Sequence, residues 1–220
     1  MFKVKICGVR SKDDIDAVAQ HVDAAIGLNF YPPSVRYLDP TKSLAGDLSA
    51  AAETAGIVRV GVFVNESADM IDDVCERVGL NAAQLHGDEP VDLVRELSAR
   101  NIAVIRAVKL PTGDLNVKEI SAATDSWIRT GCHLLLDADA GAAHGGSGKT
   151  LDWAAIADWA DEHPDASWTL AGGLRPDNVA QAMELSGASS VDTASGVEQT
   201  RGVKSATLID AFFHAVNSSV

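Results

Sequence analysis

The chain has 220 residues, of which 46% are hydrophobic, enough to bury a full core in one large α/β domain or two small ones. Its formal net charge is −13, with 22 Asp and 9 Glu against 8 Lys and 10 Arg, and no basic cluster offsets the acidic residues. So acidic a surface repels nucleic acid and anionic lipid, which argues against both as partners.

Apolar segments rich in β-branched residues recur along the whole chain, and each predicts a strand. They lie at residues 4–9, 24–30, 59–64, 82–86, 103–109, 133–138, 168–172 and 190–195. The segments between them are rich in Ala, Leu and Asp at helical spacing and predict helices. Four helix starts are marked: Ser11 with Asp14 three residues on, Ser67, the Asp-Glu-Pro of residues 88–90, and Pro176 as a first helical residue.

Regular alternation of strands and helices requires right-handed crossovers and a parallel sheet. Eight strands and eight helices in 220 residues fit one (β/α)8 TIM barrel spanning residues 1–220, near the small end of the size range. A doubly wound open sheet is the alternative, but it usually carries a GxGxxG turn after its first strand. Residues 7–11 read Cys-Gly-Val-Arg-Ser instead, which favours the barrel.

The first strand places Lys3, Lys5 and Cys7 on one face, because side chains alternate along a strand. An edge strand with solvated lysines is the simpler interpretation. In a barrel, however, chemistry occurs where strands end. Cys7, His86 and Asp137 then stand at the ends of separate strands, which turn chemistry alone does not explain.

Glycines follow both the seventh and the eighth predicted strand. Gly172 and Gly173 precede the helix expected at Pro176, and Ser195 and Gly196 precede the last helix. Exposed backbone N–H groups there, with helix dipoles behind them, predict the phosphate site that many barrels carry after strands 7 and 8. Two ordinary glycine turns are the alternative.

A third glycine-rich segment, residues 145–150, imitates the end of a nucleotide-binding P-loop. That motif needs a glycine five residues before Gly148, where this chain has Ala143. We therefore expect a mobile loop over the ligand, with Lys149 near the sixth helix.

Three widely spaced cysteines, without zinc-type spacing, indicate free thiols in a reducing cytoplasm. The sequence shows no signal peptide, membrane segment or metal-ligand cluster. The acidic composition also suits a high-salt cytoplasm, which screens self-repulsion. Salt adaptation is therefore a hypothesis, and an ordinary acidic protein is the alternative.

A set of motifs runs in order along essentially the whole chain. They are KICG at 5–8, YPPSVRY at 31–37, VGVFVN at 60–65, QLHGDE at 84–89, LLD at 135–137, GGSGK at 145–149, LAGGL at 170–174, and VD at 191–192 with SGVE at 195–198. Together these motifs resemble the phosphoribosylanthranilate isomerase family. The resemblance implies the Amadori rearrangement of N-(5-phosphoribosyl)anthranilate in tryptophan biosynthesis. It also implies a small phosphosugar substrate, no cofactor, and a monomer or homodimer.

The resemblance further implies roles for individual residues. Cys7 would be the general base and Asp137 the general acid. Arg36 would pair with the anthranilate carboxylate, because its fork matches a carboxylate. His86 and Asp192 would contact the ribose hydroxyls, unless they form a purely structural pair. Lys5, on the face of Cys7, would contact the substrate region and lower the pKa of the thiol.

Two rival functions remain open at this point. The histidine-pathway ribonucleotide isomerase would use two aspartates and show half-barrel repeats, whereas this chain has Cys7 and no visible duplication. A non-catalytic barrel that binds a phosphorylated ligand belongs to a different class. Such a binder would need neither an acid nor a base, so Cys7 with Asp137 argues against it.

Overall fold

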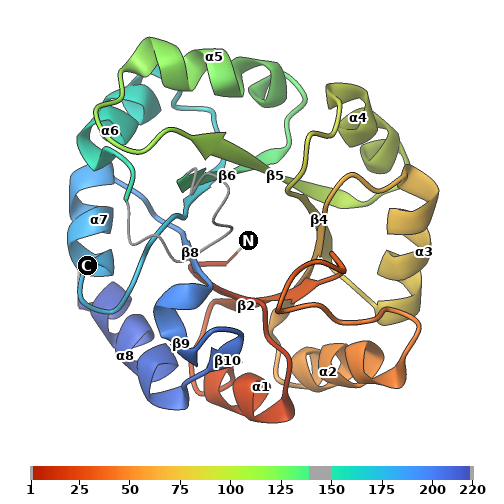
Figure 1. Ribbon diagram of the computed structural model, residues 1–220. Helices are drawn as coiled ribbons and strands as arrows, with labels where there is room; N and C mark the ends of the chain where they lie inside the picture. The colour runs from red at the N-terminus through yellow and green to blue at the C-terminus, as the bar shows by residue number, and fades with distance from the viewer. Residues whose placement is uncertain (1, 139–149, 219–220) are drawn as a thin grey trace.

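Eight parallel strands close into a barrel in the part of the chain that the computed structural model describes, residues 2–138 and 150–218. The strands are β1 Val4–Cys7, β2 Ala24–Asn29, β3 Val58–Phe63, β4 Ala82–Leu85, β5 Ala103–Leu110, β6 His133–Ala138, β7 Trp168–Leu170 and β8 Val191–Thr193. Each pairs with the next, and β8 pairs with β1, so the ring has no free edge (Figure 1). The predicted (β/α)8 barrel is confirmed.

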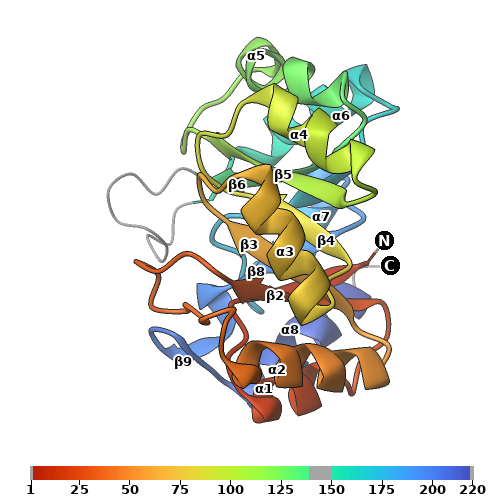
Figure 2. The same cartoon turned by 90° about the vertical axis from the view of Figure 1, so that its right-hand side faces the viewer.

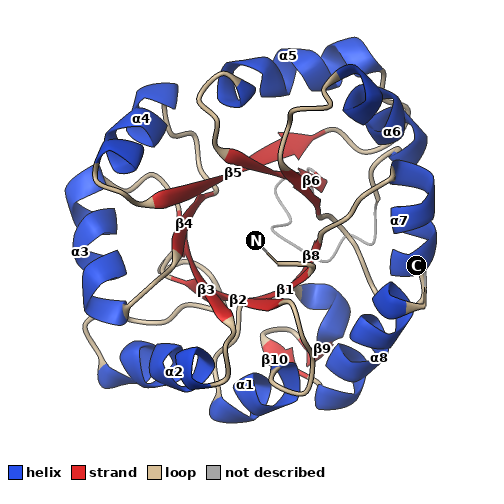
Figure 3. Ribbon diagram, turned by 180° about the vertical axis from the view of Figure 1, so that it is seen from behind, coloured by secondary structure: helices blue, strands red, loops and turns tan. Residues whose placement is uncertain are grey.

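A helix follows each barrel strand and packs against the outside of the ring (Figure 3). The helices are α1 Lys12–Val18, α2 Ser43–Thr54, α3 Ala68–Val78, α4 Val91–Ala99, α5 Val117–Ile128, α6 Trp153–Glu162, α7 Val179–Ser186 and α8 Ala206–Asn217. In the side view of Figure 2 the helices run along the barrel wall. No helix among the described residues is long and apolar enough to cross a membrane.

Strand register decides which side chains share the barrel interior. Lys5 of β1 lies level with Ala25 of β2 on one side and with Asp192 of β8 on the other. Residues level with one another in adjacent parallel strands point to the same face. The interior contains a few other buried polar side chains, such as His133, together with small and aliphatic residues that include Ala25, Ala82 and Leu135. These small side chains leave room for the long side chain of Lys5, which is completely buried.

The edge-strand interpretation of β1 is therefore wrong. β1 pairs on both sides, with β2 and β8, and the side chain of Lys5 has no exposed surface. The strand ends at Cys7 rather than at the predicted residue 9. Gly8 adopts a φ of +77°, a left-handed conformation that ends the extended chain.

Three of the four predicted helix starts agree with the structure and one does not. α4 begins at Val91, directly after the Asp-Glu-Pro of residues 88–90. Ser11 forms a capping box with Asp14, and the Ser67 side chain accepts a hydrogen bond from the N–H of Met70. The helix expected from Pro176 begins instead at Val179. The Asn178 side chain accepts from the N–H of Arg175 and donates to the carbonyl of residue 173, which holds this segment in a turn.

The segment between β8 and α8 contains structure that the sequence did not predict. A single 3₁₀ turn, η1 at Ser195–Val197, leads into a small antiparallel hairpin of β9 Glu198–Thr200 and β10 Val203–Lys204. Around the ring, this hairpin lies between α1 and α8 (Figures 1 and 3).

Candidate active site

Cys7 ends β1 at the rim of the barrel where the strands terminate. Its sulfur lies against Gly27 of β2, and a Cβ atom at that glycine would come within 2.8 Å of Sγ. Gly27 thus makes the space that the thiol occupies. Cys7 is 9% exposed, so a reagent or substrate can reach it only from the mouth of the barrel.

Lys5 and Asp192 form a buried ion pair one layer below Cys7. The Nζ atom of Lys5 donates to Oδ1 of Asp192 over 2.5 Å. Burial lowers the pKa of Lys5, but the charge of Asp192, with that of Cys7 in its thiolate form, outweighs burial and raises that pKa above its ordinary value. Lys5 therefore remains protonated and keeps a positive charge beneath the thiol.

The net shift in the pKa of the Cys7 thiol is opposite to the one expected from Lys5. Burial raises the pKa of Cys7, and this effect outweighs the opposing charge of Lys5. Asp192 raises the pKa further, whereas Lys204 and Arg36 lower it. Lys5 does act in the expected direction, but its charge is shared with Asp192, so in this structure Cys7 is a protonated thiol at neutral pH.

Asp137, near the end of β6, faces His86, which follows β4. The Nε2 atom of His86 lies 3.5 Å from Oδ2 of Asp137, and Nδ1 lies 3.0 Å from the buried amide nitrogen of Gln84. With that amide donating, Nδ1 accepts and the imidazole proton sits on Nε2, toward Asp137. The alternative pair of His86 with Asp192 is not formed, because Asp192 is held by Lys5.

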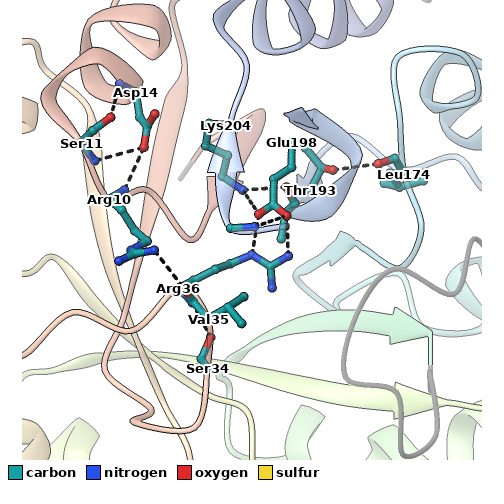
Figure 4. Close-up of polar contacts among 12 residues, drawn as sticks. Arg10, Ser11, Asp14, Ser34, Val35, Arg36, Leu174, Thr193, Glu198 and Lys204 are labelled. Carbon is teal, nitrogen blue, oxygen red and sulfur yellow. Dashed lines mark hydrogen bonds and ion pairs between the residues drawn. The ribbon is translucent and has the colours of Figure 1, made fainter. Parts of the chain in front are cut away.

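Arg36, in the segment after β2, reaches across the rim to Glu198 of β9. Its Nε and Nη2 atoms donate to the two carboxylate oxygens over 2.6 and 2.9 Å (Figure 4). The aliphatic stem of Arg36 lies over Gly8, where a Cβ atom would come within 2.2 Å of Cδ. Arg36 is therefore held directly beside Cys7, with the guanidinium edge toward Glu198 occupied.

The four residues of the predicted phosphate site lie together. Gly172 and Gly173 have φ values of +84° and +66°, and a Cβ atom at Gly196 would lie 1.9 Å from the carbonyl oxygen of Leu174. This contact packs the loop after β8 against the loop after β7. Within the described residues, the backbone N–H groups of Gly173, Ser195 and Gly196 donate to no protein acceptor.

The helix dipole expected behind Gly173 is not in place. α7 begins at Val179, six residues further on, so its first turn is not the continuation of the glycine turn. An anion at this site would be held by loop amides and by the short η1 turn rather than by the start of α7.

A family model described as N-(5'phosphoribosyl)anthranilate (PRA) isomerase matches residues 4–215. The chain belongs to the phosphoribosylanthranilate isomerase family. A relative of that name from Myxococcus xanthus is 41% identical over 218 residues, covering 98% of this chain and 96% of the relative. The family resemblance found in the sequence is thus confirmed.

Solved structures of phosphoribosylanthranilate isomerases share the fold. One from Thermotoga maritima is 35% identical with a TM-score of 0.85, covering 99% of this chain and 100% of the other. A second, 34% identical with a TM-score of 0.82 and the same coverage, is in complex with reduced 1-(o-carboxyphenylamino)-1-deoxyribulose 5-phosphate.

One polar residue at the phosphoribosylanthranilate isomerase rim was given no role by sequence reasoning. Glu198 closes the SGVE motif, yet nothing local to it indicates a partner 162 residues away in Arg36. The only signal in the sequence was an acidic residue directly after a predicted anion-binding turn, which is an unfavourable place for a carboxylate unless cations neutralise it.

The remaining expectations concern the loop after β6 and metal ligands. The segment at 145–149, with Lys149, lies outside the described residues. Across residues 2–138 and 150–218, no group of three or more His, Cys, Asp or Glu side chains could hold a metal ion.

Proposed function

We propose that this chain catalyses the Amadori rearrangement of N-(5-phosphoribosyl)anthranilate, with Cys7 as the general base and Asp137 as the general acid. The observation that carries this proposal is their placement within the family fold. Both stand at the same rim, Cys7 at the end of β1 and Asp137 near the end of β6, three strands apart around the ring. Two groups so separated can reach different atoms of one bound ribose.

The reaction assigns a proton transfer to each group. Asp137 in its acid form protonates the ribose ring oxygen, the bond from that oxygen to C1′ breaks, and a protonated Schiff base forms. The thiolate of Cys7 then removes the proton from C2′, and the electron pair left on C2′ neutralises the Schiff base to give an enolamine. A proton then adds to C1′ while the 2′-hydroxyl loses its proton, so the C2′–O2′ bond becomes the double bond of the ketone.

The thiolate requirement assigns a role to the surrounding cations. Burial raises the pKa of Cys7, whereas the charges of Lys5, Lys204 and Arg36 lower it. These three cations, Lys5 most of all, oppose burial without outweighing it, so the thiolate that acts as the base is the minor form of Cys7 at neutral pH.

Substrate contacts follow from the same rim. Arg36 receives the anthranilate carboxylate, and His86 and Asp192 face the ribose hydroxyls, with Lys5 holding Asp192 in place. The amides of Gly172, Gly173, Ser195 and Gly196 receive the phosphate. Support comes from the solved family structure that contains a reduced phosphosugar bearing the same aromatic carboxylate.

Assembly and location complete the proposal. The phosphoribosylanthranilate isomerase of Thermotoga maritima is described as dimeric, which favours a homodimer over a monomer for this chain. The three cysteines Cys7, Cys75 and Cys132 are free, which suits a reducing cytoplasm.

The roles are tested by Cys7→Ser with the reduced product named above as a ligand. A serine hydroxyl is a far weaker base, so we expect kcat to fall by about 10³-fold, while the dissociation constant of the reduced product changes by less than about threefold. Cys75→Ser, which alters a buried thiol of α3, is the matched control and should keep kcat. Equal kcat for Cys7→Ser and wild type would refute the role of the base.

A further inference from the structure

The Arg36 guanidinium is mostly buried and is held by defined contacts. Glu198 grips its Nε and Nη2 atoms, and the two side chains are only 14% and 4% exposed. The backbone N–H of Arg36 donates to the Ser34 hydroxyl, and Gly8 lies beneath its stem. These contacts restrict the side chain at its root, along its stem and at its head.

Glu198 is itself fixed by further donors. Its Oε2 atom accepts from the N–H of Gly202 over 2.9 Å, and its Oε1 atom accepts from Nζ of Lys204 over 3.1 Å. Lys204 also donates to the carbonyl of Ala194 over 2.6 Å, and its side chain is 1% exposed. Burial raises the pKa of Glu198, but hydrogen bonds from Arg36 and Gly202 with the charge of Lys204 outweigh it and lower that pKa. The carboxylate is therefore charged at neutral pH.

The hairpin that carries Glu198 is tied to the segment that carries Arg36. A Cβ atom at Gly202 would lie 3.3 Å from the carbonyl oxygen of Val35, and that carbonyl accepts a hydrogen bond from Arg10 over 3.0 Å. Three loops, after β1, β2 and β8, therefore meet around Arg36 (Figure 4).

One edge of the guanidinium stays available. Arginine has five N–H donors, and Glu198 takes the Nε–Nη2 edge. Nη1 has no hydrogen bond among the described residues and points away from Glu198 in Figure 4. Arg36 and Lys204 carry two positive charges against the one negative charge of Glu198, so the cluster keeps one net positive charge for an incoming anion.

We propose that Glu198 is a positioning residue that aims the free edge of Arg36 at the carboxylate of the substrate and so sets selectivity for carboxylate-bearing aromatic phosphosugars. The inference rests on the proposed function, in which Arg36 receives that carboxylate. Glu198 touches no reacting atom and acts on the substrate carboxylate through Arg36. If Glu198 competed with the substrate for Arg36, it would occupy the edge of the guanidinium that the substrate carboxylate needs. Glu198 instead binds Nε and Nη2 and leaves Nη1 open.

The test compares two ligands on each variant by isothermal titration calorimetry. The first ligand is the reduced product with its carboxylate, and the second is the same molecule with a plain phenylamino group. Wild type, Arg36→Met, Glu198→Gln and Glu198→Asp are titrated with both. Glu53→Gln is the matched control, because Glu53 binds Arg59 over 2.8 Å on an exposed surface. Circular dichroism and a thermal unfolding curve establish that each variant is folded.

We expect Glu198→Gln to weaken the carboxylated ligand about tenfold and the phenylamino ligand less than twofold, since charge-assisted hydrogen bonds depend on the aim of the donor. Glu198→Asp keeps the negative charge beside Lys204, but its side chain is too short to bind both Nε and Nη2 of Arg36. It should therefore show the same selective loss of the carboxylated ligand. Tighter binding of the carboxylated ligand by Glu198→Gln would identify Glu198 as a competitor and overturn the proposal. Equal losses for both ligands, or no loss, would also overturn it.

Arg36→Met separates this inference from the proposed function. If Arg36→Met loses the preference for the carboxylated ligand and the Glu198 variants keep it, the positioning role alone is wrong. If Arg36→Met keeps the preference, the carboxylate lies elsewhere, and the assignment of Arg36 in the proposed function is wrong as well.

Discussion

The Cys7 thiol lies between opposing influences that the barrel interior imposes on it. Burial holds the proton on sulfur, and the buried Lys5 cation favours its release. Asp192 neutralises part of the Lys5 charge through the 2.5 Å contact, so Lys5 does not fully offset the effect of burial on the thiol. The pH dependence of the thiol therefore reports directly on this buried pair.

Replacing Lys5 by Met should make the thiol less acidic. The sign follows from the charges: the cation lowers the pKa of Cys7, so its removal raises that pKa and leaves Asp192 without its partner. At a fixed pH near 8, we expect alkylation of Cys7 by iodoacetamide to slow by about tenfold or more, measured by mass spectrometry of the Cys7 peptide. Lys3→Met, two residues before Lys5 and outside β1, is the control. Faster alkylation in Lys5→Met would show that the assigned direction is wrong.

The sequence predicted which residues lie at the rim, but it did not predict the ion pairs that those residues form. Alternation along the first strand put Lys5 and Cys7 on one face, and the strand-end rule put Asp137 at the rim. The partners are set by ring closure: Lys5 meets Asp192 across 187 residues and Arg36 meets Glu198 across 162. No local pattern encodes such distances, so Glu198 received no role.

At the scale of elements, the turns that follow the strands pack against neighbouring strands and so position the site. Gly172 follows β7, and a Cβ atom there would lie 2.5 Å from the backbone nitrogen of Ala138, at the end of β6. Ala138 is the neighbour of Asp137. The glycine turn of the predicted phosphate site therefore packs directly against the strand that carries the acid.

Gly172→Ala should damage stability and substrate binding together. The new methyl group meets backbone rather than a flexible side chain, and φ is +84°, so we expect a loss of about 2–4 kcal/mol in the free energy of unfolding, with a raised KM. Gly187→Ala is the control: its φ is +69° but nothing lies within 4 Å, so it should lose about 1 kcal/mol and keep its KM. Urea unfolding measures both. Equal losses in the two variants would contradict the close packing at Gly172.

The elements themselves were largely predictable, because strand and helix periodicities are local properties. All eight barrel strands appear where apolar β-branched segments predicted them, within three residues at each end. The predicted start of α7 was wrong because the Asn178 side chain binds the N–H of Arg175 and the carbonyl of residue 173. These hydrogen bonds favour a turn after Pro176. The β9–β10 hairpin was missed because its strands are three and two residues long.

At the scale of the whole molecule, the charge of −13 acts as a uniform repulsion. Salt adaptation predicts that screening stabilises the fold, because the Debye length falls from about 10 Å at 0.1 M to about 3 Å at 1 M. We expect the thermal midpoint to rise by about 5 °C or more between low-salt buffer and 2 M KCl, followed by circular dichroism. Full stability and activity without added salt would contradict salt adaptation and favour an ordinary acidic protein.

The proposed function depends on one reaction and on Asp137 as its general acid. Phosphoribosylanthranilate is generated in the cuvette, and loss of its anthranilate fluorescence is followed at low and at molar salt for wild type and Asp137→Asn. Asparagine preserves the shape of Asp137 but cannot donate a proton as an acid. We expect rapid loss with wild type and none above background with the variant. No turnover by folded wild type at any salt concentration would contradict the account and leave a phosphate-binding barrel without this activity.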